Sequence, residues 1–122
     1  MDVLYTIEGV VKKGSSRGKM LGFPTANIEL LQQIPEGIYA GEVSFKNINY
    51  KAAVFVGSAK TFSENEYKLE AYLLDFKGSL YGEVLRVVLY EKLRDNKKFK
   101  NAHELTVQMK KDVLNVSSFF SK

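Results

Sequence analysis

The feature that most constrains the fold of this chain is an alternation of apolar and other side chains with a period of two residues. Successive residues of a strand point to opposite faces, so apolar residues at every second position mark half-buried strands. Runs of this kind cover residues 3–11, 38–45, 50–56, 67–76 and 80–93. Turn signals such as Asn47 to Asn49 separate the runs. Several short strands joined by turns predict a mostly β fold, an antiparallel barrel or sandwich, in a single domain over residues 1–122.

The pattern changes to a helical period near the end of the chain. Asn101 and Glu104 have the spacing of a capping box, in which two side chains satisfy backbone N–H groups at the start of a helix. Four apolar residues then fall on one helical face: Leu105, Met109, Val113 and Val116. We therefore expect one C-terminal amphipathic helix that packs on the strands, with Phe119 and Phe120 as a packed tail.

The composition excludes several kinds of site. The chain has no cysteine and one histidine, His103, so disulfides, thiolate metal sites and histidine clusters are excluded. A net charge of +4 favours anionic partners such as phosphates, but it is well below that of a dedicated nucleic-acid arm. No apolar run approaches the roughly 20 residues of a membrane span, and the first residues do not form a signal peptide. We expect a cytoplasmic protein, with no nucleic-acid partner and no membrane segment.

A glycine-containing loop is the first candidate site. It runs from Gly14 to Lys19 and resembles a phosphate-binding P-loop, but its glycines are one residue too close. Met20 also stands where such a loop carries its magnesium-binding Ser or Thr. Backbone N–H groups beside glycines, with Arg17 and Lys19, could still hold a phosphate. The alternative is a plain turn between strands.

The next segment offers ligands for a hard metal ion. Pro24 fixes the backbone ahead of Thr25, and the alternation places Thr25 and Asn27 on one side of an extended segment. A hydroxyl and an amide oxygen suit Mg²⁺, which completes its shell with waters and phosphates. The alternative is that both side chains satisfy turn backbone.

Glu70 is a candidate general base, because it lies in an otherwise apolar run with Lys68, Tyr72 and Leu74 on its face. A carboxylate among apolar and aromatic neighbours is a common setting for such a base. The alternative is an outward-facing residue paired with Lys68 or with a cation on a neighbouring strand.

The segment between the last strand and the helix carries the fourth candidate set. Arg94 and Lys97 could hold the polar edge of a planar anionic ligand that stacks on Phe99. The alternative is a solvated basic loop in which Phe99 packs against the helix.

Taken together, these residues resemble the riboflavin kinase family, which also occurs as the kinase module of bifunctional FAD synthetases. The resemblance keeps the order of the family's motifs over nearly the whole chain. The matching blocks are Gly9-Val10-Val11, Gly14 to Lys19, Leu21 to Asn27, Gly37-Ile38-Tyr39, Leu73 to Phe76, Leu80-Tyr81-Gly82, Leu93-Arg94 with Phe99, and Asp112.

The resemblance implies a six-stranded, Greek-key-like antiparallel barrel with a C-terminal helix. It also implies transfer of the ATP γ-phosphoryl group to the ribityl 5′-hydroxyl of riboflavin, which gives FMN. Each implied site takes residues from the matching positions: Gly14, Lys19 and Thr25 for ATP, Thr25 and Asn27 for Mg²⁺, Glu70 as the catalytic base, and Arg94, Lys97 and Phe99 for the flavin. We expect a monofunctional, monomeric kinase, since the adenylyltransferase half of the bifunctional enzymes has no counterpart here.

Two positions depart from the family's usual pattern. Phe55 stands where the family often has Asn, and Lys60 stands where it often has Pro. Neither removes a proposed catalytic group, but both bear on the fit of the substrates. The alternatives are a catalytically inactive flavin- or nucleotide-binding relative and a small nucleic-acid-binding barrel, which basic charge and exposed aromatic residues would suit.

Overall fold

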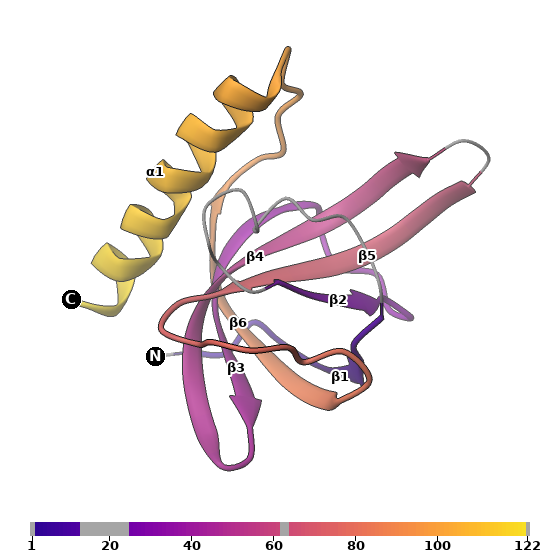
Figure 1. Cartoon of the computed structure of the whole chain (residues 1–122), viewed down its shortest axis with the longest axis vertical. Coiled ribbons are helices and arrows are strands. Elements are labelled where there is room, and N and C mark those ends of the chain that lie inside the picture. Colours follow the sequence, from indigo (N-terminus) through magenta and orange to yellow (C-terminus); the bar gives the residue numbers. More distant parts are fainter. Residues whose placement is uncertain (1, 13–24, 62–63, 122) are drawn as a thin grey trace.

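The computed structural model forms a six-stranded antiparallel sheet, curled into a barrel, with one helix on its outside (Figure 1). The structure describes residues 2–12, 25–61 and 64–121, without the side chains of residues 58–61 and 64–66. Its elements are β1 (Tyr5–Val10), β2 (Thr25–Glu29), β3 (Gly37–Phe45), β4 (Ile48–Thr61), β5 (Glu64–Leu73), β6 (Val84–Arg94) and α1 (Ala102–Phe120). The strand order is β1-β6-β3-β4-β5-β2. The two ends of this order approach each other, because Lys12, just beyond β1, forms a bridge with Asn27 of β2.

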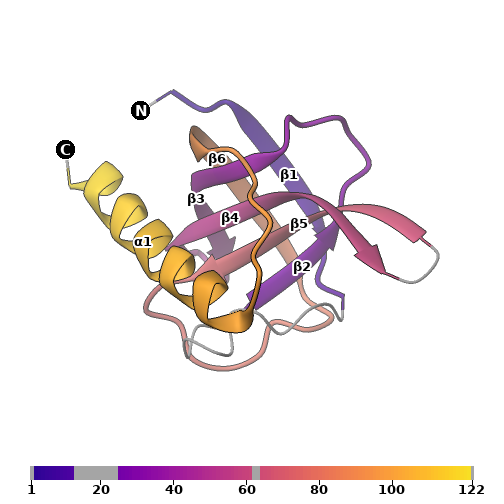
Figure 2. The same cartoon turned by 90° about the horizontal axis from the view of Figure 1, so that it is seen from above.

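The barrel interior is apolar, as the alternation predicted. Each strand turns every second side chain inward, and those of β5 are Leu69, Ala71 and Leu73, each fully buried. Figure 2 shows the strands wrapping around this interior, with the β6–α1 connection passing over the face of the sheet before α1 begins. The opposite side chains of β4 and β5 therefore lie beneath the connection and the helix.

Helix α1 packs against β3 and β4 through a second apolar cluster. Asn101 caps the helix by accepting a hydrogen bond from the Glu104 backbone N–H at 2.9 Å, which confirms the predicted start. The predicted apolar face is wrong at one position, because Asp112 is buried and Val113 is only half-buried. The polar side chain is tolerated there because it forms an ion pair with β6.

The far end of α1 is held by aromatic contacts. Phe119 and Phe120 are the last residues of the helix, not a tail after it, and both rings contact Tyr90 of β6. The Tyr90 hydroxyl donates a hydrogen bond to Glu42 of β3. This bond, together with burial, raises the pKa of Tyr90 to about 12.

Several strand boundaries differ from the prediction. The strand expected over residues 80–93 begins only at Val84, because Gly82 turns the chain with a φ of 83°. β4 continues past residue 56 to Thr61, and β5 ends at Leu73, not at residue 76. No helix within the described ranges is long and apolar enough to cross a membrane.

Candidate active site

The candidate site is built from one row of residues across the outer face of the sheet. Asn27 of β2 is the Cα partner of Glu70 on β5, which is in turn the partner of Phe55 on β4. Phe55 pairs with Ile38 on β3, and Ile38 pairs with Arg94 at the end of β6. Strand register therefore brings residues from five strands, distant in sequence, into one line. The proposed base stands between the proposed metal ligands and the proposed flavin residues.

The proposed metal ligands are Thr25 and Asn27, of which Asn27 belongs to the row and Thr25 lies two residues before it on β2. Their Cα partners on β5 are Tyr72 and Glu70, so both residues lie beside the proposed base. Asn27 is 7% exposed, and its Oδ1 atom has no hydrogen-bond partner among the described residues. A buried amide oxygen of this kind is costly to leave unsatisfied, which makes it a good ligand for a cation. The register brings Thr25 and Asn27 together as predicted.

The donors fit a metal that keeps most of its shell from other sources. Among the described residues there is no group of three or more His, Cys, Asp or Glu side chains that could hold an ion. A hydroxyl, an amide oxygen and one nearby carboxylate provide few, hard ligands. Such a set suits Mg²⁺, which usually retains waters and binds substrate phosphates.

Glu70 is fully buried, unlike an ordinary surface carboxylate. The Lys68 Nζ atom lies 3.8 Å from its Oε2 atom, and the Lys68 side chain is itself only 12% exposed. The pairing with Lys68 therefore exists, but it lies inside the site and not on a solvated face.

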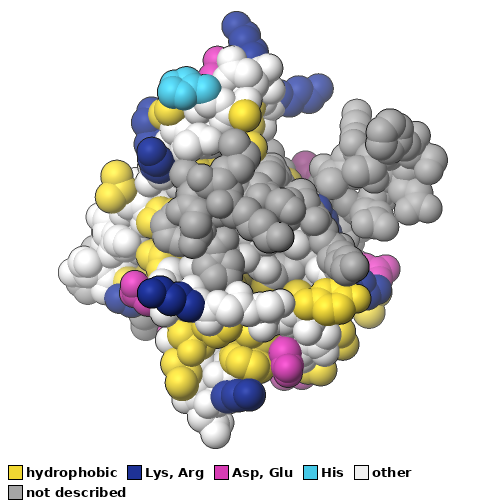
Figure 3. All heavy atoms as spheres, viewed as in Figure 1, with side chains coloured by type: hydrophobic (Ala, Val, Ile, Leu, Met, Phe, Trp, Pro, Cys, Tyr) yellow, Lys and Arg dark blue, Asp and Glu magenta, His cyan; other side chains and the backbone are white. Residues whose placement is uncertain are grey.

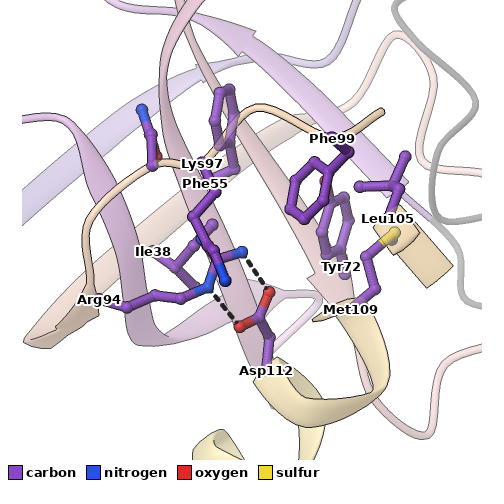
Figure 4. Close-up of a pocket in the computed structure, with 10 residues that line it drawn as sticks. Ile38, Phe55, Tyr72, Arg94, Lys97, Phe99, Leu105, Met109 and Asp112 are labelled. Atoms are coloured by element: carbon purple, nitrogen blue, oxygen red, sulfur yellow. Dashed lines mark hydrogen bonds and ion pairs between the residues drawn. The ribbon is translucent and has the colours of Figure 1, made fainter. Parts of the chain in front are cut away.

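The flavin half of the row is a small hollow beneath the β6–α1 connection (Figure 4). The hollow brings together the three residues that the sequence assigned to the flavin, Arg94, Lys97 and Phe99. Its walls come from β3, β4, β5 and α1: Ile38, Phe55, Tyr72, Leu105, Met109 and Asp112. An apolar floor with cations at its rim suits a planar heterocycle.

Arg94 is held rigidly by the helix, as the dashed lines of Figure 4 show. Its Nε and Nη2 atoms donate to the two carboxylate oxygens of Asp112, each at 2.7 Å, and Nη1 donates to the Asp95 carbonyl at 2.9 Å. Gln108 also donates to Asp112, at 3.0 Å. Because a guanidinium has five N–H groups, two remain for a ligand.

Sequence reasoning misses the role of Asp112, which is visible there only as part of the family pattern. The detectable signal is a carboxylate on the apolar face of a helix, three residues after Met109. A buried carboxylate needs a cation, and the sequence offers several. Only the packing of α1 beside the end of β6 shows that Arg94 is the cation that pairs with Asp112.

Other sequence predictions fall outside what the structure describes. Gly14 and Lys19 lie in the segment 13–24, and the side chain of Lys60 is not described. Phe55, the other departure from the family pattern, lies in the row next to Glu70 and lines the hollow. Its ring therefore bears directly on the shape of the proposed flavin site. His103 is exposed in the first turn of α1.

Comparison with known proteins identifies the family of the chain. Residues 1–120 match the family model described as "Flavokinase: Riboflavin kinase". The chain is 33% identical to the bifunctional riboflavin kinase/FMN adenylyltransferase of Bacillus subtilis, over 96% of this chain and 39% of that protein. The chain spans between 18% and 39% of the length of the curated relatives that it matches.

Two solved structures are similar to the fold. The riboflavin kinase of Trypanosoma brucei superposes with a TM-score of 0.67 and 27% identity, over 96% of this chain and 80% of that chain. A Streptococcus pneumoniae protein described as a macrolide-efflux protein superposes with a TM-score of 0.80 and 33% identity, over 92% of this chain and 38% of that chain.

Proposed function

This chain belongs to the riboflavin kinase family, and we propose that it transfers the γ-phosphoryl group of ATP to the ribityl 5′-hydroxyl of riboflavin, giving FMN and ADP. One observation carries the proposal. In the row across the sheet, buried Glu70 has Thr25 and Asn27 on one side. On its other side lies the hollow lined by Phe99 and its neighbours. An acceptor hydroxyl and a phosphate donor can therefore meet at a carboxylate.

Glu70 acts as the general base. Its carboxylate accepts the proton of the 5′-hydroxyl while the ribityl oxygen forms a bond to the γ-phosphorus and the bond from that phosphorus to the ADP oxygen breaks. Phosphoryl transfer depends mainly on positioning and on charge neutralisation. A base fixed by strand register supplies the positioning without reorganisation.

Thr25 and Asn27 hold the divalent metal, which we take to be Mg²⁺. When bound, the ion neutralises charge on the ATP phosphates. The buried Asn27 Oδ1 atom is the support for this assignment within the structure. We assign Gly14 and Lys19 to the nucleotide. Thr25 is half-buried and directly follows the segment 13–24 that contains them, so we assign it to the nucleotide as well.

The flavin ring stacks on Phe99, with the cations of Arg94 and Lys97 at its polar edge. The hollow has a volume of about 20 Å³, which holds one water molecule but no tricyclic ring. Riboflavin binding therefore requires the connection over residues 95–101 to move outward. Return of the connection over the bound substrate would then exclude water from the reaction.

An assay of product formation tests the proposed function directly. The purified protein is incubated with riboflavin, ATP and Mg²⁺, and FMN is followed by chromatography with fluorescence detection. We expect FMN and ADP in equal amounts, and none without the metal. Flavin or nucleotide binding without FMN would identify an inactive relative. Salt-sensitive oligonucleotide binding without FMN would instead favour the nucleic-acid-binding barrel.

The surface gives that last alternative little support. Among the described side chains on the face shown in Figure 3, those of Lys and Arg are dispersed among acidic and apolar ones. We also propose a monomer in the cytoplasm, in keeping with a cysteine-free chain of modest charge. Size-exclusion chromatography with light scattering tests the monomer.

A further inference from the structure

We infer that Lys68 is a further catalytic residue, whose ammonium group contacts the phosphoryl group during its transfer. This inference rests on the proposed function. Its starting point is an unusual cation: the Lys68 side chain is 12% exposed, and its one ion pair among the described residues is with Glu70. Lysine is almost never this buried unless its charge is paired. At 3.8 Å from Glu70 Oε2, the Nζ atom is too far for a hydrogen bond.

Lys68 is directed to this place by its neighbours across the sheet. Its Cα partner on β2 is Glu29, a ready counter-ion, but the Glu29 carboxylate already accepts a hydrogen bond from Lys12 at 2.8 Å. Its partner on β4 is Gly57, and the side chains of Asn96 and Phe55 already occupy the space above that glycine. Lys68 therefore extends along β5 toward Glu70 and retains all three N–H donors for a ligand.

The other described cations of the site lie farther from the base. Arg94 is three strands away from Glu70 along the row, a backbone separation of roughly 14 Å at 4.8 Å per strand. Three of its N–H groups are already bonded to the protein. Lys97 lines the hollow with Arg94. Within the described part of the chain, Lys68 is thus the cation that forms an ion pair with the base.

Its placement complements the metal. Along β5, Tyr72 and Glu70 pair with Thr25 and Asn27, and Lys68 follows on the other side of Glu70. A phosphoryl group at Glu70 therefore has metal ligands toward one end of the strand and an ammonium group toward the other. Negative charge on the transferring group is best stabilised by fixed positive groups of this kind.

The test compares Lys68→Met, which keeps the length of the side chain but removes its charge, with Lys68→Arg, which keeps the charge. We expect Lys68→Met to lower kcat by about 10²–10³-fold while the Kd for ADP changes by less than about threefold, since ADP lacks the transferred group. Lys68→Arg should recover most of the loss. Lys46→Met, which removes a distant cation from the β3–β4 turn, is the matched control and should keep the wild-type kcat.

A pH profile separates this role from simple support of Glu70. If Lys68 only keeps the Glu70 carboxylate ionised, then raising the pH restores the rate of Lys68→Met. If it contacts the phosphoryl group, the loss persists across the neutral and alkaline range. Restoration at high pH would overturn the inference, and so would an unchanged kcat.

Two further outcomes are decisive. If Lys68→Met fails to fold, as judged by circular dichroism, then Lys68→Gln replaces it, and an unchanged kcat in that variant refutes the inference. A wild-type protein that produces no FMN would refute the proposed function itself. A wild-type protein that produces FMN, with Lys68→Met equally active, would refute only the role of Lys68.

Discussion

The two faces of strand β5 are both buried, but they are buried for different reasons. Leu69, Ala71 and Leu73 point into the barrel and pack with the other apolar side chains of the core. On the opposite face, Glu70 is equally inaccessible but lies beside Lys68 and pairs across the strand with Asn27. The inward face is the expected solution for stability. The outward face carries polar groups whose burial is costly unless a ligand meets them.

This contrast teaches that burial alone does not separate core from site. Burying an apolar side chain stabilises the fold, whereas burying a carboxylate or an unpaired amide oxygen opposes folding. A protein retains such groups where they serve function, and it depends on the core elsewhere to remain folded. Substitutions on the two faces should therefore have opposite signatures, one in stability and the other in activity.

Glu70→Gln should give the largest effect and sharpen the contrast most. The amide keeps the shape of the side chain but cannot accept the proton, so we expect kcat to fall by about 10²–10⁴-fold. The free energy of unfolding should change less than kcat, because removing one buried charge also leaves Lys68 without its partner. Steady-state kinetics and urea denaturation measure both. A variant with wild-type kcat would show that Glu70 is not the base.

Leu69→Ala tests the other face at the neighbouring position. Leu69 is fully buried in the barrel interior, so its truncation leaves a cavity and should lower the free energy of unfolding by about 2–5 kcal/mol. The kcat of the protein that remains folded should be close to that of the wild type. A large loss of kcat without a loss of stability would break the distinction between the two faces.

Asn27→Ala should affect stability and activity by smaller amounts: it should not lower the stability of the metal-free protein, but it should weaken the use of the metal. Removing the buried Oδ1 atom takes away an unsatisfied acceptor, so the metal-free protein should be as stable as the wild type or slightly more stable. The Mg²⁺ concentration for half-maximal activity should rise on the order of tenfold, equivalent to about 1.4 kcal/mol. Metal titrations of FMN formation measure this. An unchanged metal requirement would remove Asn27 from the metal site.

The fold was largely predictable from the sequence because alternation is a local signal. The strands around Tyr39 and Val87, and the helix capped by Asn101, need only the period of two, the period of 3.6 and a cap. The start of β6 was misplaced because the apolar residues Leu80 and Tyr81 continue the pattern into a turn set by Gly82.

The site was harder to predict, because its geometry depends on register. Thr25, Asn27 and Glu70 were each chosen from local context and family resemblance. Neither source of information shows that Asn27 pairs with Glu70. The partnership of Arg94 with Asp112 and the burial of Lys68 also arise between segments distant in sequence. Contacts of this kind depend on which strands are neighbours, and no window along the chain contains that information.

Tyr90→Phe should have the smallest effect, and it marks the limit of the contrast. Tyr90 also lies on the outer face, but its hydroxyl donates to Glu42 and its ring contacts Phe119 and Phe120, away from the row. This hydrogen bond joins β6 to β3 and fixes the ring that contacts α1, so we expect its loss to cost about 1 kcal/mol of unfolding free energy at neutral pH and to leave kcat unchanged.

The pH dependence of this loss has a definite sign. The pKa of Tyr90 is raised from 10.0 to about 12 in the folded protein, first by the hydrogen bond to Glu42 and then by burial. The bond therefore contributes its full stability below pH 10 and loses it as the pH rises toward 12. Urea denaturation of both proteins over this range should show the difference between them disappearing. A difference that persists near the upper limit would show that ionisation of the Tyr90 hydroxyl does not govern it, and the bond to Glu42 would then not be its source.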